Sequence, residues 1–352
     1  MMIPKLYKYP VLLMLVATTL IGCATTKTEQ TTPTVAAEGP TDGVFGPDAL
    51  KKLTPSCRGD KALNIAFFLN TQNNTFVQAM KSGAEQAAKE CNIKLDVFDA
   101  KFDTTTQINQ IEDAITAGKY TAFVIQPVDS VPIVESAKNA IDHKIIVSVT
   151  NSPLGDAADR YPGTITYVGH KEIEVGKQAG QMALDALGEK CGKILIVSGL
   201  AASPITQNRT NGFAKNMSRN PNCKIVSDQP ADFDEGKAQS VIENLIQAHP
   251  DAALVYAHSD NMASGAITAL KAAGKQLKVV SVGASEQGLK LIASGEMYGT
   301  IYFRPFIQGQ LPTVAAAVVA RGAAIADIAP YYNDSGNQII TRQNVTDFRA
   351  EW

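Results

Sequence analysis

The stretch that decides the fold is Ile65-Ala-Phe-Phe-Leu-Asn-Thr-Gln-Asn-Asn-Thr-Phe-Val-Gln-Ala-Met-Lys-Ser-Gly83. Its first five residues are all apolar, which is the length of a buried strand and too short for a helix. A polar loop follows at 70–74, and from Val77 onward apolar residues recur at helical spacing. Strand, loop and helix in this order predict the first unit of a parallel α/β sheet.

Parallel sheets bind ligands in the crevice beyond the carboxyl ends of their strands. Asn73, Asn74 and Phe76 follow the first predicted strand and are therefore candidate site residues. The alternative for the asparagines is purely local, because this residue type also forms turns and caps helices. The stretch by itself leaves the two interpretations equally open.

An internal repeat extends this unit over most of the chain. At an offset of 131 residues, Phe102-Asp103 matches Phe233-Asp234, and the correspondence continues without a gap to Asp129 and Asp260. Further on, residues 147–149 match 280–282. The period is far longer than the 20 to 50 residues of a solenoid. The repeat predicts two similar α/β lobes.

Each lobe is expected to be a doubly wound parallel sheet with right-handed crossovers, because strands and helices alternate. The helix expected over 104–118 has a threonine as N-cap and a glycine stop, and its counterpart ends at His249-Pro250. The predicted strands lie at 65–69, 94–99, 122–125 and 145–149 in the first lobe, and at 194–198, 224–227, 253–256 and 279–282 in the second.

Four cysteines also follow the repeat. Cys57 and Cys191 precede the first strand of their lobes, and Cys91 and Cys223 precede the second. First and second strands are neighbours in a doubly wound sheet, so we predict the disulfides Cys57–Cys91 and Cys191–Cys223. Four free thiols are the alternative, and the spacer 58–63 between Cys57 and its strand favours it.

The N-terminus has the features of an export signal. Two lysines precede a short apolar run at 11–20, which is about half the length needed to span a bilayer. The run ends in Leu20-Ile21-Gly22-Cys23, which resembles the lipobox of bacterial lipoproteins and implies cleavage after residue 22 and acylation of Cys23. Residues 23–56, poor in large apolar side chains, are expected to form a disordered tether. Export places the protein in an oxidising compartment, where disulfides persist.

Composition and motifs exclude several functions. The chain has 352 residues and a formal net charge of −2, and no basic block remains outside the signal to bind nucleic acid. Nucleophile elbows, Walker loops, dinucleotide fingerprints and metalloprotease motifs are missing, and the four histidines lack metal-ligand spacing. We therefore expect no enzyme, no cofactor and no metal. The acidic run 228–235 is interpreted as a solvated loop, with Asp234 capping the next helix, rather than a calcium site.

With these features in view, the chain resembles the type I periplasmic solute-binding proteins of the ribose-binding and simple-sugar group. The similarity covers about 64–344 and is carried by the stretches 69–83, 126–130, 211–213, 229–234, 248–251 and 259–263. It implies two lobes joined by three hinge crossings, near Gly169, Phe303–Arg304 and Gly336, that close around a ligand. The implied N-terminal lobe is 57–168 plus 304–335, including a helix over 305–321, and the C-terminal lobe is 169–303 plus 336–352.

The ligand residues that the resemblance implies are mostly neutral. Asn74, Phe76 and Phe233 keep the family's residue types, whereas Thr150, Asn151, Gln207, Ser259, Gly283 and Phe303 replace polar or charged ones. Arg304 is the one charge expected nearby, and Trp352, far along the sequence, is not expected to contribute. We expect a small, uncharged or singly anionic ring compound, such as a deoxy sugar, a furanose or a nucleoside-like molecule, between Phe76 and Phe233. The alternative is that both rings belong to the core.

The resemblance implies a lipid-anchored receptor, monomeric and on the periplasmic face of the inner or outer membrane. It would deliver a sugar-like solute to the permease and ATPase of an ABC importer. A ligand-sensing subunit that presents the solute to a membrane receptor or kinase is the alternative. The effector domain of a repressor would need an N-terminal helix-turn-helix where this chain has a signal. An exported enzyme would need a nucleophile or a metal site.

Overall fold

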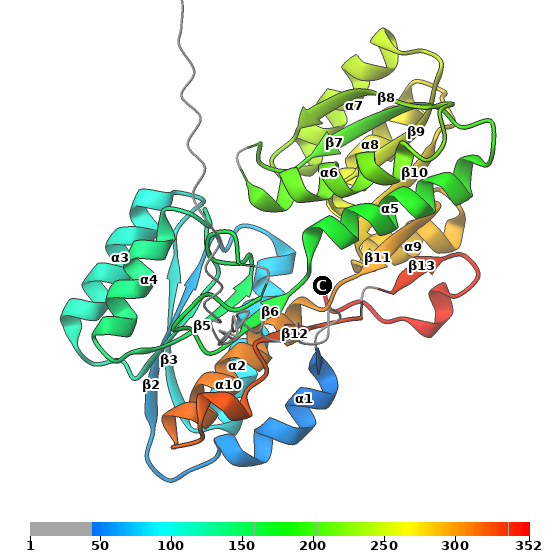
Figure 1. The fold of residues 1–352 in the computed structure, drawn as a ribbon. Helices are drawn as coiled ribbons and strands as arrows, with labels where there is room; N and C mark the ends of the chain where they lie inside the picture. The colour runs from blue at the N-terminus through cyan, green and yellow to red at the C-terminus, as the bar shows by residue number, and fades with distance from the viewer. Residues whose placement is uncertain (1–43, 158, 202, 337) are drawn as a thin grey trace, which may run out of the picture. The chain divides into compact units, whose positions relative to one another are not determined.

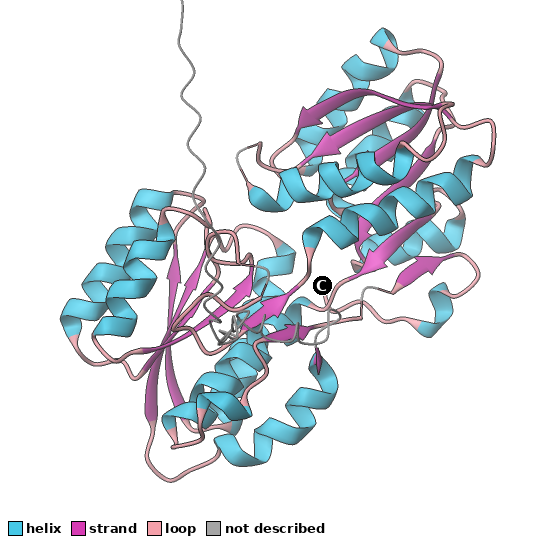
Figure 2. Ribbon diagram, in the orientation of Figure 1, coloured by secondary structure: helices cyan, strands magenta, loops and turns pink. Residues whose placement is uncertain are grey.

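The computed structural model describes residues 44–352 except 158, 202 and 337, so the predicted signal peptide and Cys23 lie outside the described residues. Two sheets organise this part of the chain, and each is covered by helices on both faces (Figures 1 and 2). We refer to each sheet with its helices as a lobe. Along the part of the chain that the structure describes, no helix is both long and apolar enough to cross a membrane.

The sheet of the N-terminal lobe has seven strands in the order β1-β12-β6-β5-β4-β2-β3, and all neighbours are parallel. Its strands are β1 (Val44–Phe45), β2 (Leu63–Leu69), β3 (Ile93–Asp99), β4 (Ala122–Ile125), β5 (Ile146–Asn151), β6 (Tyr167–Gly169) and β12 (Tyr331–Asn333). Strand β3 pairs with one side of β2, and β4 pairs with the other side. This is the doubly wound order that the alternating pattern predicts.

Helices cover both faces of this sheet (Figure 1). On one face, α2 (Thr75–Glu90), α10 (Pro305–Ala320) and α1 (Gly46–Leu53) share a core with alternate residues of β2, such as Ile65 and Phe67. On the other face, α3 (Thr104–Ala117) and α4 (Ile133–Asp142) pack on Phe68 and its neighbours. Successive side chains of a strand point to opposite faces, which is why β2 is apolar throughout.

The sheet of the C-terminal lobe has six strands in the order β13-β11-β10-β9-β7-β8. They are β7 (Gly192–Ser198), β8 (Cys223–Pro230), β9 (Ala252–Ala257), β10 (Lys278–Gly283), β11 (Gly299–Tyr302) and β13 (Ile339–Thr341), the last antiparallel to β11. Helices α5 (Glu172–Leu187) and α6 (Pro204–Met217) cover one face. The helices α7 (Glu235–Ala248), α8 (Asp260–Ala272) and α9 (Glu286–Ser294) cover the other.

All eight predicted strands are present, so the expectation of two doubly wound α/β lobes is confirmed. The predicted threonine cap is wrong, because Asp103 is the N-cap of α3 and its carboxylate accepts from the Thr106 N–H at 2.6 Å. The repeat-equivalent Asp234 caps α7 in the same way, as expected. Asp103 rather than Thr104 is the N-cap because its backbone is extended, whereas Thr104 is already the first residue of the helix.

The predicted tether is also wrong at its C-terminal end. Residues 44–57 form β1, α1 and a 3-10 helix, η1 (Thr54–Cys57). In α1, Ala49, Leu50 and Leu53 are buried against the N-terminal lobe. These three residues recur at a spacing of one, three and four, which places them on one helix face. The polar composition of the longer segment hid this short amphipathic element.

Close helix pairs hold each lobe together in the same way. A Cβ atom at Gly83 of α2 would lie 1.9 Å from the carbonyl oxygen of Phe306, and one at Gly309 of α10 would lie 1.8 Å from that of Met80. In the other lobe, the corresponding approaches are Gly212 to Ile173 and Gly176 to Arg209, both at 2.1 Å. Only glycine allows two helix backbones to approach this closely.

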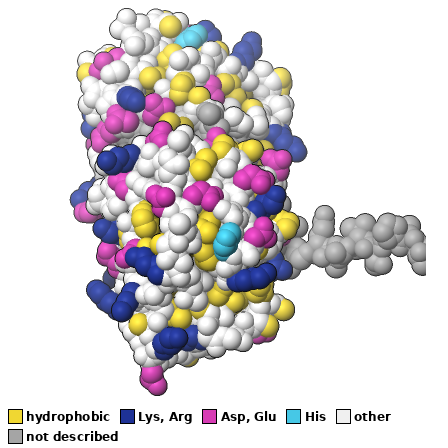
Figure 3. Space-filling view, turned by 90° about the vertical axis from the view of Figure 1, so that its left-hand side faces the viewer, with side chains coloured by type: hydrophobic (Ala, Val, Ile, Leu, Met, Phe, Trp, Pro, Cys, Tyr) yellow, Lys and Arg dark blue, Asp and Glu magenta, His cyan; other side chains and the backbone are white. Residues whose placement is uncertain are grey.

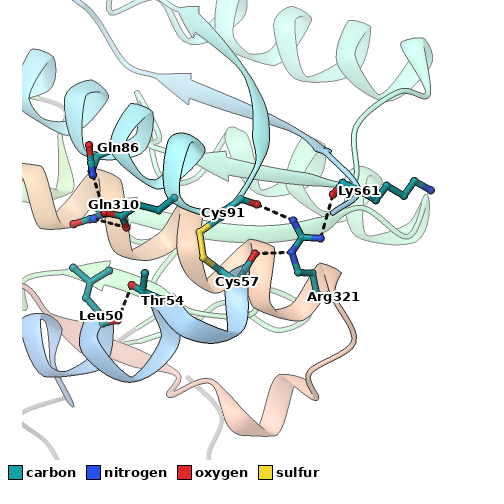
Figure 4. Close-up of a disulfide and its surroundings, with 9 residues drawn as sticks. Leu50, Thr54, Cys57, Lys61, Gln86, Cys91, Gln310 and Arg321 are labelled. Carbon is teal, nitrogen blue, oxygen red and sulfur yellow. Dashed lines mark hydrogen bonds between the residues drawn. A yellow bond between two sulfur atoms is a disulfide. The ribbon is translucent and has the colours of Figure 1, made fainter. Parts of the chain in front are cut away.

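Both predicted disulfides are present. Cys57–Cys91 and Cys191–Cys223 have Cα–Cα distances of 5.1 and 5.0 Å, within the usual range. The first ties η1 to the end of α2 beside Arg321 (Figure 4). The Arg321 guanidinium donates to the carbonyl oxygens of Cys57 and Cys91 at 2.5 and 2.7 Å. The spacer after Cys57 therefore does not prevent pairing, because η1 brings the cysteine back to the sheet edge.

The chain passes between the two sheets at three places: after β6, after β11, and between β12 and β13. Side chains tie the three crossings together. Asp334 Oδ2 accepts from the Arg304 N–H at 2.7 Å, and Asp334 Oδ1 lies 2.7 Å from His170 Nε2. The His170 ring stacks on Phe303 with centroids 3.5 Å apart. The hinge crossings that the resemblance implies therefore form one packed cluster.

Surface charge is mixed. On the face shown in Figure 3, basic and acidic side chains are interspersed, with hydrophobic side chains between them. This face offers no continuous basic surface of the kind that tracks a phosphate backbone. Among the described residues, no group of three histidine, cysteine or acidic side chains is placed to hold a metal ion.

Candidate functional site

A cleft of about 100 Å³ lies at the carboxyl ends of strands from both sheets. Its lining residues include the segments that follow β2, β3, β4 and β5 in one lobe and β7, β8, β9, β10 and β11 in the other. This is the edge at which open α/β sheets bind ligands. The volume suits a small solute.

Four phenylalanine rings line the cleft: Phe76, Phe102, Phe233 and Phe303. Phe102 and Phe233 occupy equivalent positions of the repeat, and both have left-handed backbone conformations, with φ of 59° and 58°. A bulky residue rarely adopts this conformation outside functional sites, because its Cβ is crowded there. Each ring is therefore held toward the cleft by the same turn in its lobe.

The wall from the N-terminal lobe is a relay of amides. Gln126 Oε1 accepts from the Asn70 N–H at 3.3 Å, and Gln126 Nε2 donates to Asn151 Oδ1 at 3.1 Å. Asn151 Nδ2 donates to Gln308 Oε1, and Gln308 Nε2 donates to Asp334 Oδ2, both at 3.0 Å. The relay connects the cleft wall with the carboxylate at the hinge. Because each amide is held by its neighbours, this wall is neutral and fixed in position.

The wall from the C-terminal lobe contains a buried ion pair. Arg209 donates from Nε and Nη2 to the two oxygens of Glu172 at 2.5 and 3.0 Å, with both side chains less than a tenth exposed. The same guanidinium donates from Nη1 to the carbonyl oxygen of His258 at 2.7 Å. The bidentate geometry fixes the guanidinium, which in turn fixes the end of β9.

His258 is fully buried at this end of β9. Its Nδ1 lies 3.4 Å from the Gly199 N–H, so the ring accepts there and carries its proton on Nε2. Burial, with the Arg209 charge as a second cause, holds the pKa of His258 well below the ordinary value for histidine. The imidazole is therefore neutral and presents an N–H donor.

Three buried polar atoms of cleft-lining residues have no hydrogen-bond partner among the described residues. They are Asn70 Oδ1, His258 Nε2 and Trp352 Nε1. Buried polar groups are nearly always paired in folded proteins, and exceptions require an explanation such as a bound ligand. Two N–H donors and one acceptor oxygen match the hydroxyl groups of a small polar solute.

Six of the nine ligand residues expected from the sequence line the cleft: Asn74, Phe76, Asn151, Phe233, Ser259 and Phe303. Asn74 and Ser259 also cap α2 and α8, so the local interpretation of Asn74 holds together with its position at the cleft. The expectation that both Phe76 and Phe233 face the cleft agrees with this placement.

Three expected residues lie elsewhere, which corrects the sequence-based set. Thr150 points away from the cleft in β5 and donates to the carbonyl oxygen of Gln308 at 2.6 Å. Gln207 is exposed on the outer side of α6, two residues before Arg209, and two residues rotate a helix by more than half a turn. Arg304 lies at the start of α10, where its Nε donates to Glu351 at 2.7 Å.

The lining also contains Phe102, Arg209 and Trp352, which are not among the residues predicted from the sequence. The repeat match between Phe102 and Phe233 is a signal that predicts Phe102. Arg209 lies two residues after Gln207, the residue of α6 that the resemblance implies. Trp352 was excluded for its position in the sequence, and this expectation is wrong because its indole lines the cleft. No local pattern could have placed it there, since its contact with Phe76 joins residues far apart in the chain.

The fold and the cleft define a two-lobe solute-binding protein, and comparison with known proteins agrees. The sequence model of the periplasmic binding protein domain matches residues 65–324. The chain belongs to the periplasmic binding protein family. The description of the family and the names of the relatives are those of binding proteins, which points to a binding protein rather than an enzyme at the level of the family.

Individual relatives are consistent with this. The ribose import binding protein RbsB of Bacillus subtilis is 32% identical over 275 residues, covering 77% of this chain and 86% of the relative. The D-allose-binding periplasmic protein of Escherichia coli is 29% identical over 250 residues, covering 69% and 80%. A solute-binding protein of an ABC transporter from Mycobacterium smegmatis, solved with bound glycerol, superimposes with a TM-score of 0.75 at 31% identity, covering 83% and 99%.

Proposed function

We propose that this protein is a lipid-anchored periplasmic receptor that captures a small sugar-like ring compound between its two lobes and delivers it to an ABC importer. The observation that carries the proposal is the cleft itself. Aromatic rings from both lobes line it together with three unpaired buried polar atoms. Aromatic faces stack on the apolar faces of a sugar ring, while the polar atoms bond its hydroxyls.

The named relatives support the choice of ligand class, since two of them carry ribose and allose in their names. The neutral amide wall argues for an uncharged ring. Phe303 lines the cleft, where it is stacked on His170 and almost fully buried. This apolar surface reduces the number of hydroxyls that can be paired, so we expect a deoxy sugar or a furanose to bind more tightly than ribose or glucose.

The proposal also covers the closure of the lobes, docking on the permease and the lipid anchor. Ligand contacts with both lobes would favour a closed state over an open one, with the hinge crossings at 169–170, 303–304 and 334–336 absorbing the motion. The closed surface would dock on the permease that works with an ATPase. Cys23, acylated after removal of residues 1–22, would hold the receptor at the membrane, and residues 23–43 would serve as the tether.

Calorimetry with a panel of ring compounds tests the ligand class. The panel contains D-ribose, D-allose, L-arabinose, myo-inositol and xylitol, together with deoxy sugars and furanosides. At least one compound should bind, and Phe233→Ala should weaken its binding more than tenfold, which corresponds to about 1.4 kcal/mol. Phe98→Ala is the matched control, because Phe98 stacks on Phe68 away from the cleft. Binding that is indifferent to Phe233→Ala would refute the assigned cleft.

The anchor is tested separately. Intact-mass measurement of membrane-extracted protein should show a diacyl or triacyl group on Cys23, and Cys23→Ser should yield a soluble, unacylated protein. Cleavage at another residue would remove the lipid anchor from the proposal and leave the receptor function standing.

A further inference from the structure

We propose that Trp352 is a ligand-binding residue that shapes the specificity of the cleft, with its indole as one wall and its Nε1–H as a donor to the bound sugar. This inference rests on the proposed function and goes beyond it by adding a residue distant in sequence from every other part of the site.

The indole is seated between residues of both lobes. Its ring meets Phe76, in the first turn of α2, edge to face, with centroids 5.3 Å apart and an interplanar angle of 85°. The indole also lies against Gly283 at the end of β10, where a Cβ atom would approach Trp352 Cζ2 to 2.8 Å. Glycine at 283 therefore provides the space that the indole occupies, because any side chain there would collide with it.

The segment 349–352 is anchored through the side chain of Glu351 and through the backbone of Trp352. Glu351 accepts from Arg304 Nε at 2.7 Å and from the Phe306 N–H at 3.0 Å, at the first turn of α10. A carboxylate is favoured at a helix N-terminus, whose N–H groups have no partner within the helix. The Trp352 carbonyl oxygen accepts from the Glu286 N–H at 2.8 Å. The indole is therefore held in one position rather than resting on the surface.

The unpaired Nε1–H identifies what the indole does there. It is buried and lacks a hydrogen-bond partner among the described residues, as do His258 Nε2 and Asn70 Oδ1 of the same cleft. A buried indole usually pairs its N–H. A hydroxyl or ring oxygen of a sugar would supply this partner, and the indole face would cover the sugar beside Phe76. If the indole were a plug instead, its removal would tighten binding.

Fluorescence provides a direct test, because Trp352 is the single tryptophan of the chain. In the ligand-free protein its emission should be blue-shifted and protected from acrylamide, and Gly283→Leu should shift it to the red by displacing the indole. Titration with D-ribose, D-allose, L-arabinose, myo-inositol and xylitol should change the emission for each compound that binds by calorimetry. A solvent-exposed emission in the wild-type protein would overturn the assignment.

Affinity measurements separate the contribution of the Trp352 ring from that of its Nε1–H donor. Trp352→Ala should weaken binding of the tightest panel compound at least tenfold, and Trp352→Phe, which keeps a ring and loses the N–H, should weaken it about threefold. Phe98→Ala serves as the control outside the cleft, and thermal unfolding of each variant checks the fold. Unchanged or tighter binding by both Trp352 variants would overturn the inference alone. A wild-type protein that binds none of the compounds would overturn the sugar proposal and the role of Trp352 in it.

Discussion

Both lobes contain a helix pair in close contact through glycines, but the side chains beside these glycines differ between the lobes. In the N-terminal lobe, α2 and α10 meet at Gly83 and Gly309, while α5 and α6 meet at Gly176 and Gly212 in the other. Beside the first pair lie Met80 and Pro305, and at the equivalent positions of the second lie Arg209 and Glu172. Two buried apolar residues in one lobe thus stand at the positions of a buried ion pair in the other.

This difference shows which part of the repeat carries function. The glycines fix the backbone approach and are kept in both lobes, whereas the neighbouring side chains have diverged. A buried ion pair is a poor source of stability, because desolvation offsets most of its attraction. Arg209 lies at the cleft and holds the carbonyl of His258, so the pair positions a polar wall. In the N-terminal lobe, neutral amide side chains position the polar wall of the cleft instead.

Breaking the ion pair should have the largest effect. Arg209→Met leaves the Glu172 carboxylate buried without its partner and should lower the free energy of unfolding by about 3–5 kcal/mol. Adding Glu172→Leu should recover most of this loss, because well-packed apolar residues can replace a buried ion pair at little cost, and the other lobe has apolar residues at these positions. Urea unfolding measures both, with Met80→Leu as the control at less than about 1.5 kcal/mol. A double variant as unstable as the single one would contradict the comparison.

The disulfides should contribute equally. Their sequence separations are 34 and 32 residues, so the chain-entropy model gives each about 3–4 kcal/mol. Cys57→Ala with Cys91→Ala should therefore destabilise the protein as much as Cys191→Ala with Cys223→Ala, as measured by urea unfolding. Reduced wild-type protein is the control for the combined loss. A difference of several kcal/mol between the two pairs would show that the lobes do not share this framework.

The glycine contacts should also be equivalent. Gly83→Ala and Gly212→Ala each place a methyl group about 2 Å from a backbone oxygen of the partner helix. Such overpacking should cost about 1–3 kcal/mol in either lobe. Gly236→Ala in α7 is a matched control, because its Cβ would meet nothing closer than 3.5 Å. We expect this control to be neutral or slightly stabilising in thermal unfolding. Tolerance of alanine in one lobe only would break the symmetry.

The smallest effect is a pH dependence confined to the C-terminal lobe. His258 has a folded-state pKa below its unfolded value, first because of burial and then because of Arg209. Its contribution to stability is therefore constant above the unfolded pKa of about 6.5 and decreases below it, by about 1.4 kcal/mol per pH unit. The equivalent position of the other lobe is Pro127, which does not titrate.

Urea unfolding from pH 7.5 to 5.5 measures this slope, and His258→Asn should reduce it while keeping an acceptor for the Gly199 N–H. Burial raises the pKa of the nearby Asp260, and this group is present in both proteins. The difference between wild type and variant isolates the histidine. Identical slopes would mean that His258 is not buried in its neutral form.

Much of the site's position was predictable. The apolar run at 65–69, its polar loop and the repeat place Asn74, Phe76 and Phe233 at strand ends, and parallel pairing brings these ends to one edge. Gln207 and Thr150 were misplaced because side-chain direction within a helix or strand depends on rotation about its axis. A residue match along the sequence does not fix that rotation, whereas packing of α6 and β5 does.

The sequence by itself determined the two α/β lobes, the eight central strands and both disulfide pairings. These depend on local periodicity and on a repeat that can be read along the chain. Only the tertiary structure decided that Arg209 pairs with Glu172, that His258 is buried, and that Trp352 lines the cleft beside Phe76. Such contacts join distant segments, and their partners are set by how the helices and the hinge pack, which no local pattern specifies.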